Sequence, residues 1–274
     1  MRAHLLQLDL AWEDRGANFA LVERAIDDAA PDEGDLLVLP ELFDSGFSLN
    51  TDATADRSGA TLSFLLRLAE DLGVTVQGSR TVRDCHCEKA QNRATVAGPT
   101  QGSNHDDTGA TLLADYAKVH PFSFGREPER FEGGSDVAVY RWHGPQDALT
   151  VCPVVCYDLR FPELFRAGVD RGAEAFACGA NWPAERQSHW RALTVARAIE
   201  NQAFVLAVNR VGSDPYLSYA GGTIAVGPRG EVLGELDDRA GVLSVEIDPA
   251  RVRSWREEFP VLRDRRLRGD SSPR

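Results

Sequence analysis

The chain has 274 residues, of which 43% are hydrophobic and 26% charged, and its formal net charge at pH 7 is -12. This composition allows a sizeable core and argues against a disordered chain. The acidic balance excludes general binding to nucleic acid or to an anionic membrane, because most of the surface would repel both.

The N-terminal region gives no sign of a targeting segment. It reaches Asp9 before any long apolar run, and no stretch approaches the about 18 apolar residues of a membrane-spanning helix. The five cysteines are scattered and odd in number, which fits a reducing compartment. We expect a cytoplasmic protein with one domain over residues 1–262 and a basic tail or arm over residues 263–274.

The first half of the chain alternates predicted strands and helices. Hydrophobic periodicity and end signals predict, in order, a strand over 3–10, an amphipathic helix over 18–30, a strand ending at Glu41 and a helix over 61–72 closed by Gly73. Strands over 74–82 and 91–96 flank a polar turn, and a strand over 110–116 leads to Lys118.

In the second half, strands come in pairs between helices. The predicted elements are strands over 136–142 and 148–155, a helix over 162–168, a strand over 173–178, a helix over 188–201, a strand over 204–209, a hairpin over 224–234, a strand over 241–247 and a short helix near Val252. This alternation predicts an α/β fold, a four-layer α-β-β-α sandwich of two mixed sheets flanked by helices.

Three of the apolar strands run into reactive side chains. The sequence Leu36-Leu37-Val38-Leu39-Pro40 precedes Glu41, the strand over 110–116 precedes Lys118, and Val151-Cys152-Pro153-Val154-Val155 precedes Cys156. Strand ends of this kind meet at the edge of a sheet, where ligands bind in α/β folds. We therefore expect a carboxylate, an ammonium and a thiol to share one pocket.

Each of the three also has an ordinary structural interpretation. Taken alone, Cys156 would be a small, buried hydrophobic residue. Glu41 would be a carboxylate at the N-terminus of a helix, and Lys118 would be a surface residue in a salt bridge. Only two of the 30 basic residues are lysines, however. In a chain that uses Arg almost everywhere, an embedded Lys indicates a need for a compact ammonium.

The segments Leu39-Pro40-Glu41, Lys118-Val119-His120 and Cys156-Tyr157-Asp158-Leu159-Arg160-Phe161-Pro162-Glu163 resemble, in that order, the three signatures of the nitrilase (carbon-nitrogen hydrolase) superfamily. The similarity continues through Asn181-Trp182-Pro183 and residues 196–203 and 208–212. Within the superfamily the second half most resembles the omega-amidase branch, although Ala117 and Pro121 depart from its usual Asp and Leu.

The resemblance implies a role for each reactive residue. Cys156 would be the nucleophile, Glu41 the general base that takes the thiol proton, and Lys118 the cation that stabilises the tetrahedral oxyanion, together with the backbone N–H of Tyr157. It also implies a second glutamate after the lysine. Alignment on Gly134 selects Glu127 and leaves Glu129 as the alternative.

The same resemblance suggests a substrate. It implies an amidase that hydrolyses the ω-amide of a small 2-oxo acid, 2-oxoglutaramate or 2-oxosuccinamate, through a thioester, and a protein that pairs into homodimers. The alternatives are a nitrilase, an N-carbamoyl amine hydrolase or a deaminated glutathione amidase. From a different class, a catalytically silent binding protein with the same fold is also possible.

Residues for substrate binding are inferred from their types and positions. Asn181 and Trp182 suit a polar contact beside an aromatic wall, and Phe47, Phe124 and Trp182 are candidates to line an acyl pocket. An Arg is the natural partner of a substrate carboxylate, and Arg186 and Arg126 are the candidates. We expect Arg160, His120 and His189 to have structural roles.

Other motifs lack the spacing that their chemistry needs. Cys85-His86-Cys87 has no second ligand pair at zinc-site spacing, and no phosphate-binding loop or dinucleotide fingerprint is present. We therefore expect no metal and no cofactor.

Overall fold

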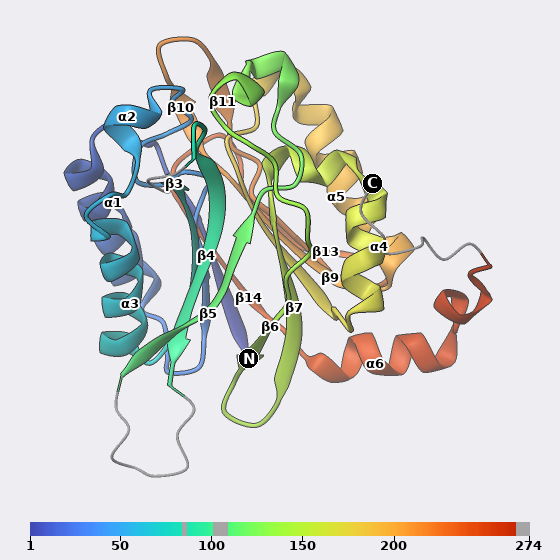
Figure 1. Ribbon diagram of the computed structural model, residues 1–274. Coiled ribbons are helices and arrows are strands. Elements are labelled where there is room, and N and C mark those ends of the chain that lie inside the picture. The colour runs from blue at the N-terminus through green and yellow to red at the C-terminus, as the bar shows by residue number, and fades with distance from the viewer. Residues whose placement is uncertain (84–86, 101–108, 267–274) are drawn as a thin grey trace.

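The computed structural model describes residues 1–83, 87–100 and 109–266 (Figure 1). Two six-stranded sheets pack face to face and helices cover their outer faces, so the predicted α-β-β-α sandwich is confirmed. The strand order is β14-β1-β2-β3-β4-β5 in the first sheet and β13-β12-β9-β8-β7-β6 in the second. In both sheets three parallel central strands are flanked by antiparallel ones.

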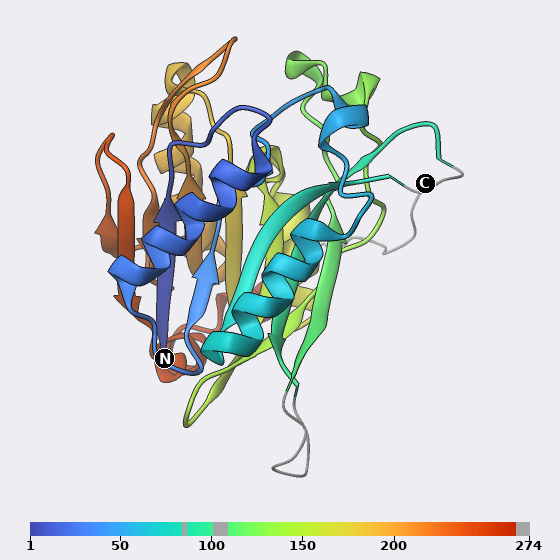
Figure 2. The same cartoon turned by 90° about the vertical axis from the view of Figure 1, so that its left-hand side faces the viewer.

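The first sheet is built mainly from the first half of the chain. Its elements and the helices near it are β1 (Arg2–Gln7), α1 (Arg15–Ala29), β2 (Leu36–Val38), α2 (Thr51–Thr54), α3 (Ala60–Leu72), β3 (Thr75–Val82), β4 (Gln91–Pro99), β5 (Ala110–Ala117) and the late strand β14 (Gly241–Glu246). Figure 2 shows α1 and α3 side by side over its outer face.

The second sheet follows in the chain. Its elements and neighbours are β6 (Tyr140–His143), β7 (Ala148–Val155), α4 (Pro162–Asp170), β8 (Ala175–Ala180), α5 (Gln187–Asn201), β9 (Phe204–Asn209), the separate hairpin β10 (Val211–Ser213) and β11 (Ser218–Ala220), β12 (Ile224–Val226), β13 (Val232–Glu235) and α6 (Pro249–Glu258). Helices α4 and α5 cover its outer face (Figure 1).

Three apolar clusters hold the layers together. The central one joins the inner faces of the sheets and contains Leu5, Val38, Trp142 and Phe204, all fully buried. A second lies between the first sheet and helices α1 and α3, and a third between the second sheet and helices α4 and α5. Burial of these faces supplies most of the folding free energy, because apolar area removed from water is the main favourable contribution.

Helix ends follow the sequence signals. Gly73 closes α3 with a φ of 64°, in the left-handed conformation that favours glycine at this position, as predicted. At α1 the Asp14 side chain accepts a hydrogen bond from the backbone N–H of Ala17, so the helix begins at Arg15, three residues before the predicted start.

Several predicted strands are shorter in the structure, and the strand predicted over 3–10 ends at Gln7. The strand predicted over 136–142 pairs only from Tyr140 onward, because Asp136 instead caps the N–H of Val137 and pairs with Arg171 outside the sheet. The strand predicted to end at Glu41 ends at Val38, and the chain then turns. Helix α2 and the hairpin β10–β11 are short elements that the sequence patterns did not predict.

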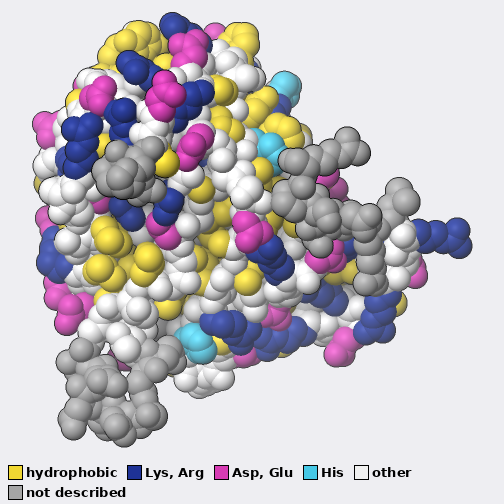
Figure 3. Space-filling model, viewed as in Figure 1, with side chains coloured by type: hydrophobic (Ala, Val, Ile, Leu, Met, Phe, Trp, Pro, Cys, Tyr) yellow, Lys and Arg dark blue, Asp and Glu magenta, His cyan; other side chains and the backbone are white. Residues whose placement is uncertain are grey.

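Charge is spread over the surface. Acidic and basic side chains alternate over the face seen in Figure 3. Many of them pair, as Arg253 does with Asp147 and Glu174 and Arg191 does with Glu235. Isolated exposed pairs of this kind contribute little stability, typically below about 1 kcal/mol each.

Some predictions fall on residues that are not described. Cys85 and His86 lie outside the described residues, as does most of the tail predicted over 263–274. Within the described part, Arg265 pairs with Asp170, and the boundary at residue 262 stays a prediction. None of the described helices is long and apolar enough to cross a membrane.

Candidate active site

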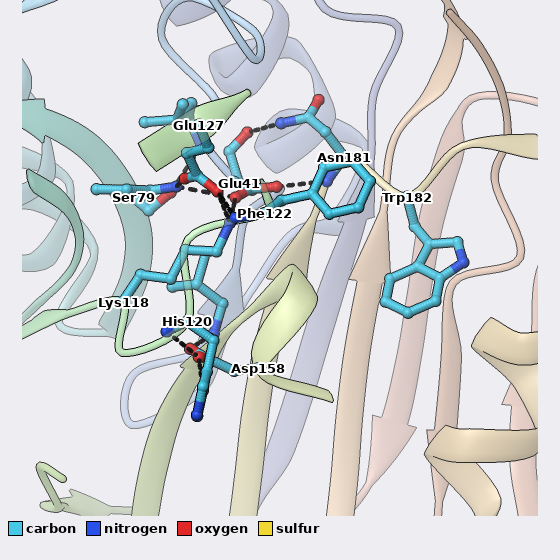
Figure 4. A network of polar contacts seen from close by, with 12 residues as sticks. Glu41, Ser79, Lys118, His120, Phe122, Glu127, Asp158, Asn181 and Trp182 are labelled. Atoms are coloured by element: carbon cyan, nitrogen blue, oxygen red, sulfur yellow. Dashed lines mark hydrogen bonds and ion pairs between the residues drawn. The ribbon is translucent and has the colours of Figure 1, made fainter. Parts of the chain in front are cut away.

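Reactive groups from both sheets meet where three strands end: Glu41 and Lys118 point toward each other in Figure 4, and both line one pocket with Cys156. Glu41 lies three residues beyond β2, Lys118 directly follows β5, and Cys156 directly follows β7. Gly179 on β8 allows the segment that leads to Glu41 to lie close to the second sheet. A Cβ at Gly179 would lie 2.5 Å from the carbonyl oxygen of Leu39. The predicted meeting of carboxylate, ammonium and thiol is therefore seen in the geometry.

The Lys118 ammonium joins two buried carboxylates. Its Nζ donates to Oε1 of Glu41 and to Oε2 of Glu127, both at 2.8 Å, and all three side chains are at most 1% exposed. Burial would lower the pKa of Lys118, but Glu127 and Glu41 outweigh it and hold that pKa well above its usual value. Lys118 therefore stays a cation across the physiological pH range.

Glu127 and Glu129 occupy opposite environments. Glu127 is fully buried, and its Oε2 also accepts the backbone N–H of Phe122 at 2.5 Å. Burial raises its pKa, Lys118 opposes that rise, and Glu41 adds to it. The Glu129 side chain is 54% exposed and pairs with Arg126. A positive φ of 61° at Arg126 turns the chain so that Glu127 faces inward.

Asn92 on β4 is a member of the network that sequence reasoning missed. Its side-chain Nδ2 donates to Oε1 of Glu41 at 2.8 Å and to Oε1 of Glu127 at 3.3 Å. Its backbone carbonyl accepts the N–H of Lys118 at 2.8 Å. A single Asn inside a predicted strand gives no signal of this kind.

Cys156 occupies a strained turn. Its φ of 46° lies in the left-handed region, where a residue with a Cβ is uncommon and costs about 1–3 kcal/mol. Burial raises the pKa of its thiol well above the usual value, Glu41 raises it further, and Lys118 lowers it. The resting group is therefore a thiol, and a base must remove its proton before it can attack.

Asp158 connects the cysteine turn to the lysine loop and was also missed as a functional residue. Its carboxylate accepts the N–H of Val155, the hydroxyl of Tyr116 at 2.8 Å, and the N–H and Nδ1 of His120. His120 thus has the structural hydrogen bond that was expected. Four contacts to one buried carboxylate fix Cys156 relative to Lys118.

The reactive groups line an inner pocket, here defined by twelve side chains: Glu41, Phe47, Lys118, Phe122, Cys156, Tyr157, Arg160, Asn181, Trp182, Pro183, Arg186 and Leu217. The inner pocket is narrow, with a cavity volume of only about 20 Å³. The outer hollow that adjoins it is much larger, with a volume of about 700 Å³ by the same measure. Phe47, Phe122, Arg186 and Leu217 line both. These four side chains form the passage between them.

Two guanidinium groups face the inner pocket. Arg160 stacks 4.5 Å from the Trp182 ring centre, and Arg186 lies 5.0 Å from that of Phe124. Among the described residues Arg160 forms no ion pair and its hydrogen-bond partner is Nδ1 of His189, whereas Arg186 lies 4.0 Å from the carboxylate of Glu185. Burial lowers the pKa of Arg160, and repulsion from Arg186 adds to the lowering. The structural role predicted for Arg160 is therefore incomplete, because its side chain is part of the pocket.

Two candidate binding residues lie elsewhere. Phe124 is 79% exposed and lines the outer hollow rather than the inner pocket, so the predicted contact with the acyl group is not supported. Arg126 also lines the outer hollow, where it pairs with Glu129. Both residues follow the turn after Phe122, which points them away from Cys156.

The segment after β8 supports the base. The backbone N–H of Asn181 donates to Oε2 of Glu41 at 3.0 Å, and its Nδ2 donates to the Glu41 carbonyl at 2.6 Å. Trp182 is held by two hydrogen bonds with Asn209 at the end of β9. Asn181 therefore acts on Glu41 as well as lining the pocket, which the sequence did not indicate.

The described residues offer no cluster of three or more His, Cys, Asp or Glu suited to a metal ion. The site instead combines a thiol, two carboxylates and an ammonium. These groups suffice chemically for nucleophilic attack on a carbonyl or nitrile carbon, with proton transfer and charge stabilisation.

Comparison with known proteins decides the family. The model of the family "Carbon-nitrogen hydrolase" matches residues 2–257. The chain belongs to the carbon-nitrogen hydrolase family. The predicted superfamily and the predicted class, a hydrolase of non-peptide carbon-nitrogen bonds, are therefore confirmed.

Two curated relatives of this family cover nearly the whole chain. A 2-oxoglutaramate amidase from Bacillus subtilis (strain 168) is 34% identical over 94% of this chain and 95% of its own length. Omega-amidase YafV from Escherichia coli (strain K12) is 32% identical over 96% of each chain.

A solved structure of another carbon-nitrogen hydrolase resembles this chain over nearly its whole length. XC1258 from Xanthomonas campestris, described with an arsenic adduct in its active site, superposes with a TM-score of 0.85 and 32% identity over 98% of each chain. The likeness covers both sheets and all segments that carry the reactive groups, so the site is built on the fold that the family shares.

Proposed function

We propose that this carbon-nitrogen hydrolase is an omega-amidase that converts a small 2-oxo acid amide, 2-oxoglutaramate or 2-oxosuccinamate, to the 2-oxo acid and ammonia. The observation that carries the proposal is the joint lining of one pocket by Glu41, Lys118 and Cys156 with the two guanidinium groups of Arg160 and Arg186. The 2-oxoglutaramate amidase and omega-amidase activities of the relatives support it.

In the first half-reaction Cys156 attacks the amide carbon. Glu41 accepts the thiol proton as the Sγ–C bond forms, and the negative charge on the amide oxygen is stabilised by the Lys118 ammonium and the backbone N–H of Tyr157. Glu41 then gives its proton to the leaving nitrogen. The C–N bond breaks, ammonia departs and a thioester remains.

In the second half-reaction water enters the place of ammonia. Glu41 takes a proton from this water, the oxygen attacks the thioester carbon, and the same oxyanion contacts stabilise the intermediate. The C–S bond then breaks and the proton returns to Cys156. Glu127, by accepting a hydrogen bond from Lys118, keeps the ammonium in place during both steps.

The charges favour an anionic substrate. Lys118 is paired with Glu41 and Glu127, and Arg186 lies 4.0 Å from Glu185, whereas Arg160 forms no ion pair among the described residues and is left to meet a substrate carboxylate. The narrow inner pocket fits the small amide end, and Arg186 at the passage can bind the carboxylate. A glutamine-like substrate would instead bring an ammonium toward the two Arg side chains.

The test is ammonia release from 2-oxoglutaramate and 2-oxosuccinamate, with glutamine and a simple nitrile alongside. We expect turnover of the 2-oxo acid amides by the parent, loss in Cys156→Ala, and retention in Cys152→Ala, which removes a buried thiol from the same strand outside the pocket. Preference for the nitrile, an N-carbamoyl amine or deaminated glutathione would replace the substrate while keeping the thiol mechanism.

The remaining assignments rest on the family resemblance. We propose a homodimer and a cytoplasmic location, both consistent with the acidic chain and its thiols. Equilibrium sedimentation at micromolar concentration tests the dimer, and a mass equal to one chain would exclude it.

A further inference from the structure

We propose that Asn92 is a positioning residue that bridges the carboxylates of Glu41 and Glu127 and aims Glu41 at Cys156. The proposal rests on the function proposed above, and it concerns a residue whose contacts reach the reacting thiol only through Glu41. Its support is the geometry of one amide group between two carboxylates.

An amide nitrogen has two hydrogens, and Asn92 uses one on each carboxylate. The orientation follows from chemistry, because the reverse placement would set the amide oxygen against two carboxylate oxygens. In the observed orientation Oδ1 is buried without a hydrogen-bond partner in the part of the chain that the structure describes. The fold thus leaves one acceptor unsatisfied in order to supply both donors.

The contacts of Asn92 also select which oxygen of Glu41 remains for chemistry. Asn92 and Lys118 both donate to Oε1, whereas Oε2 accepts only the N–H of Asn181 among the hydrogen bonds of the described residues. With Oε1 held by two donors, Oε2 is the oxygen available to the Cys156 thiol. Loss of Asn92 would free the carboxylate to rotate and would leave Lys118 as the single bridge between Glu41 and Glu127.

The backbone of Asn92 adds a second constraint. Its carbonyl accepts the N–H of Lys118 at 2.8 Å, so one residue of β4 sets both the start of the lysine loop and the carboxylates that the lysine contacts. At 1% exposure and as the second residue of β4, where it pairs with Thr81 of β3, Asn92 has little freedom to move.

The titratable groups whose charges act on the two carboxylates are Lys118, Cys156, Cys178 and Tyr219. None of the four changes charge between about pH 5 and 8, because each has a pKa raised above its usual value. Burial raises the pKa of Glu127 as well, which places that carboxylate to take up a proton as the pH falls. A donor to a carboxylate stabilises its ionised form, so the contribution of Asn92 is present at higher pH and is lost as Glu127 becomes protonated.

The experiment compares Asn92→Ala and Asn92→Asp with a matched control, Asn201→Ala. Asn201 is likewise fully buried and has an unpartnered Oδ1, but it lies at the end of α5 and its Nδ2 bonds the Arg197 carbonyl. We expect Asn92→Ala to lower kcat about 10- to 100-fold with KM changed by less than about threefold, and Asn92→Asp to lower it further. Asn201→Ala should keep kcat per folded molecule within about twofold.

Two readouts separate positioning from general stability. The acid limb of the pH–kcat/KM profile should move to higher pH in Asn92→Ala, and the Tm difference from the parent should be larger at about pH 8 than at about pH 5. For Asn201→Ala neither should change with pH. Asn92→Ser, which keeps one donor, should fall between parent and Asn92→Ala and serves if the alanine variant does not fold.

An unshifted acid limb together with a Tm difference that is the same at both pH values would overturn the proposal. The Tm readout needs no substrate. If the parent hydrolyses no amide, the proposed function fails, whereas the effect of Asn92 on the carboxylate pair is still decided by the two Tm differences.

Discussion

The inner pocket and the outer hollow use the same residue types in opposite ways. In the inner pocket and just behind it, Glu41, Glu127 and Lys118 are buried and mutually bonded. In the outer hollow, Glu13 and Arg126 are exposed, and Arg126 pairs with the exposed Glu129. Buried partners cannot be replaced by water, so removing one inner group should have consequences that removal of its outer counterpart lacks.

The largest contrast is expected between Glu41 and Glu13. Glu41→Gln should lower kcat by about 10²- to 10⁴-fold, the usual loss on removing a general base. The pKa of the Cys156 thiol should fall at the same time, because Glu41 raises it in the parent. The measurements are ammonia release and the pH dependence of thiolate absorbance. Glu13→Gln should change neither, and a lower thiol pKa accompanied by full turnover in Glu41→Gln would contradict the assignment of Glu41 as base.

Lys118→Met should lower kcat by about 10²- to 10³-fold, as expected for loss of an oxyanion contact. Here the thiol pKa should rise, since Lys118 lowers it, so Glu41 and Lys118 variants are expected to shift the same titration in opposite directions. Lys89, the other lysine, is exposed and donates to the carbonyl of Pro128. Lys89→Met is the matched control, and an equal loss in both variants would point to a general effect on folding.

Glu127 and Glu129 offer the same contrast between a buried and an exposed carboxylate, only two positions apart in the chain. Glu127→Gln removes a partner of the buried Lys118 ammonium, and we expect about a 10-fold or greater loss of kcat together with a lower Tm. Glu129→Gln removes only an exposed pair, and its effect on Tm should lie within the small range typical of surface ion pairs. Equal kinetics for the two variants would leave the second glutamate unassigned.

The smallest effect concerns binding rather than turnover. Arg186→Met should raise KM for 2-oxoglutaramate by about 10- to 100-fold, equivalent to one charge-assisted hydrogen bond, while sparing a neutral amide. Arg126→Met should leave both KM values close to the parent, because Arg126 faces the outer hollow. An equal rise of KM for the neutral and the anionic substrate in Arg186→Met would contradict the assignment of Arg186 to the substrate carboxylate.

The sequence predicted the layers and the three reactive strand ends because both depend on local patterns. Apolar β-prone runs define strands such as β7 and β9, and the motifs around Glu41, Lys118 and Cys156 are contiguous. Short elements such as β10 and β11 were missed, since three residues are too few to show a period.

The missing parts of the site depend on contacts between distant segments. Asn92 lies 51 residues from Glu41 in the chain, and Asn181 lies 140 residues from it. Glu127 and Glu129 differ only in the direction that the positive φ at Arg126 gives the chain. The misplacement of Phe124 has the same origin, because an aromatic residue near a motif carries no information about which side of a turn it faces.

The bonds of Asp158 have a consequence for thermal inactivation. Tyr116 and His120 lie on or next to the end strand of the first sheet, and Val155 ends a strand of the second, so one carboxylate joins the two layers beside the reaction centre. Local melting of the centre would have to break this junction, whose carboxylate is fully buried. Heat inactivation should therefore coincide with separation of the sheets and not precede it.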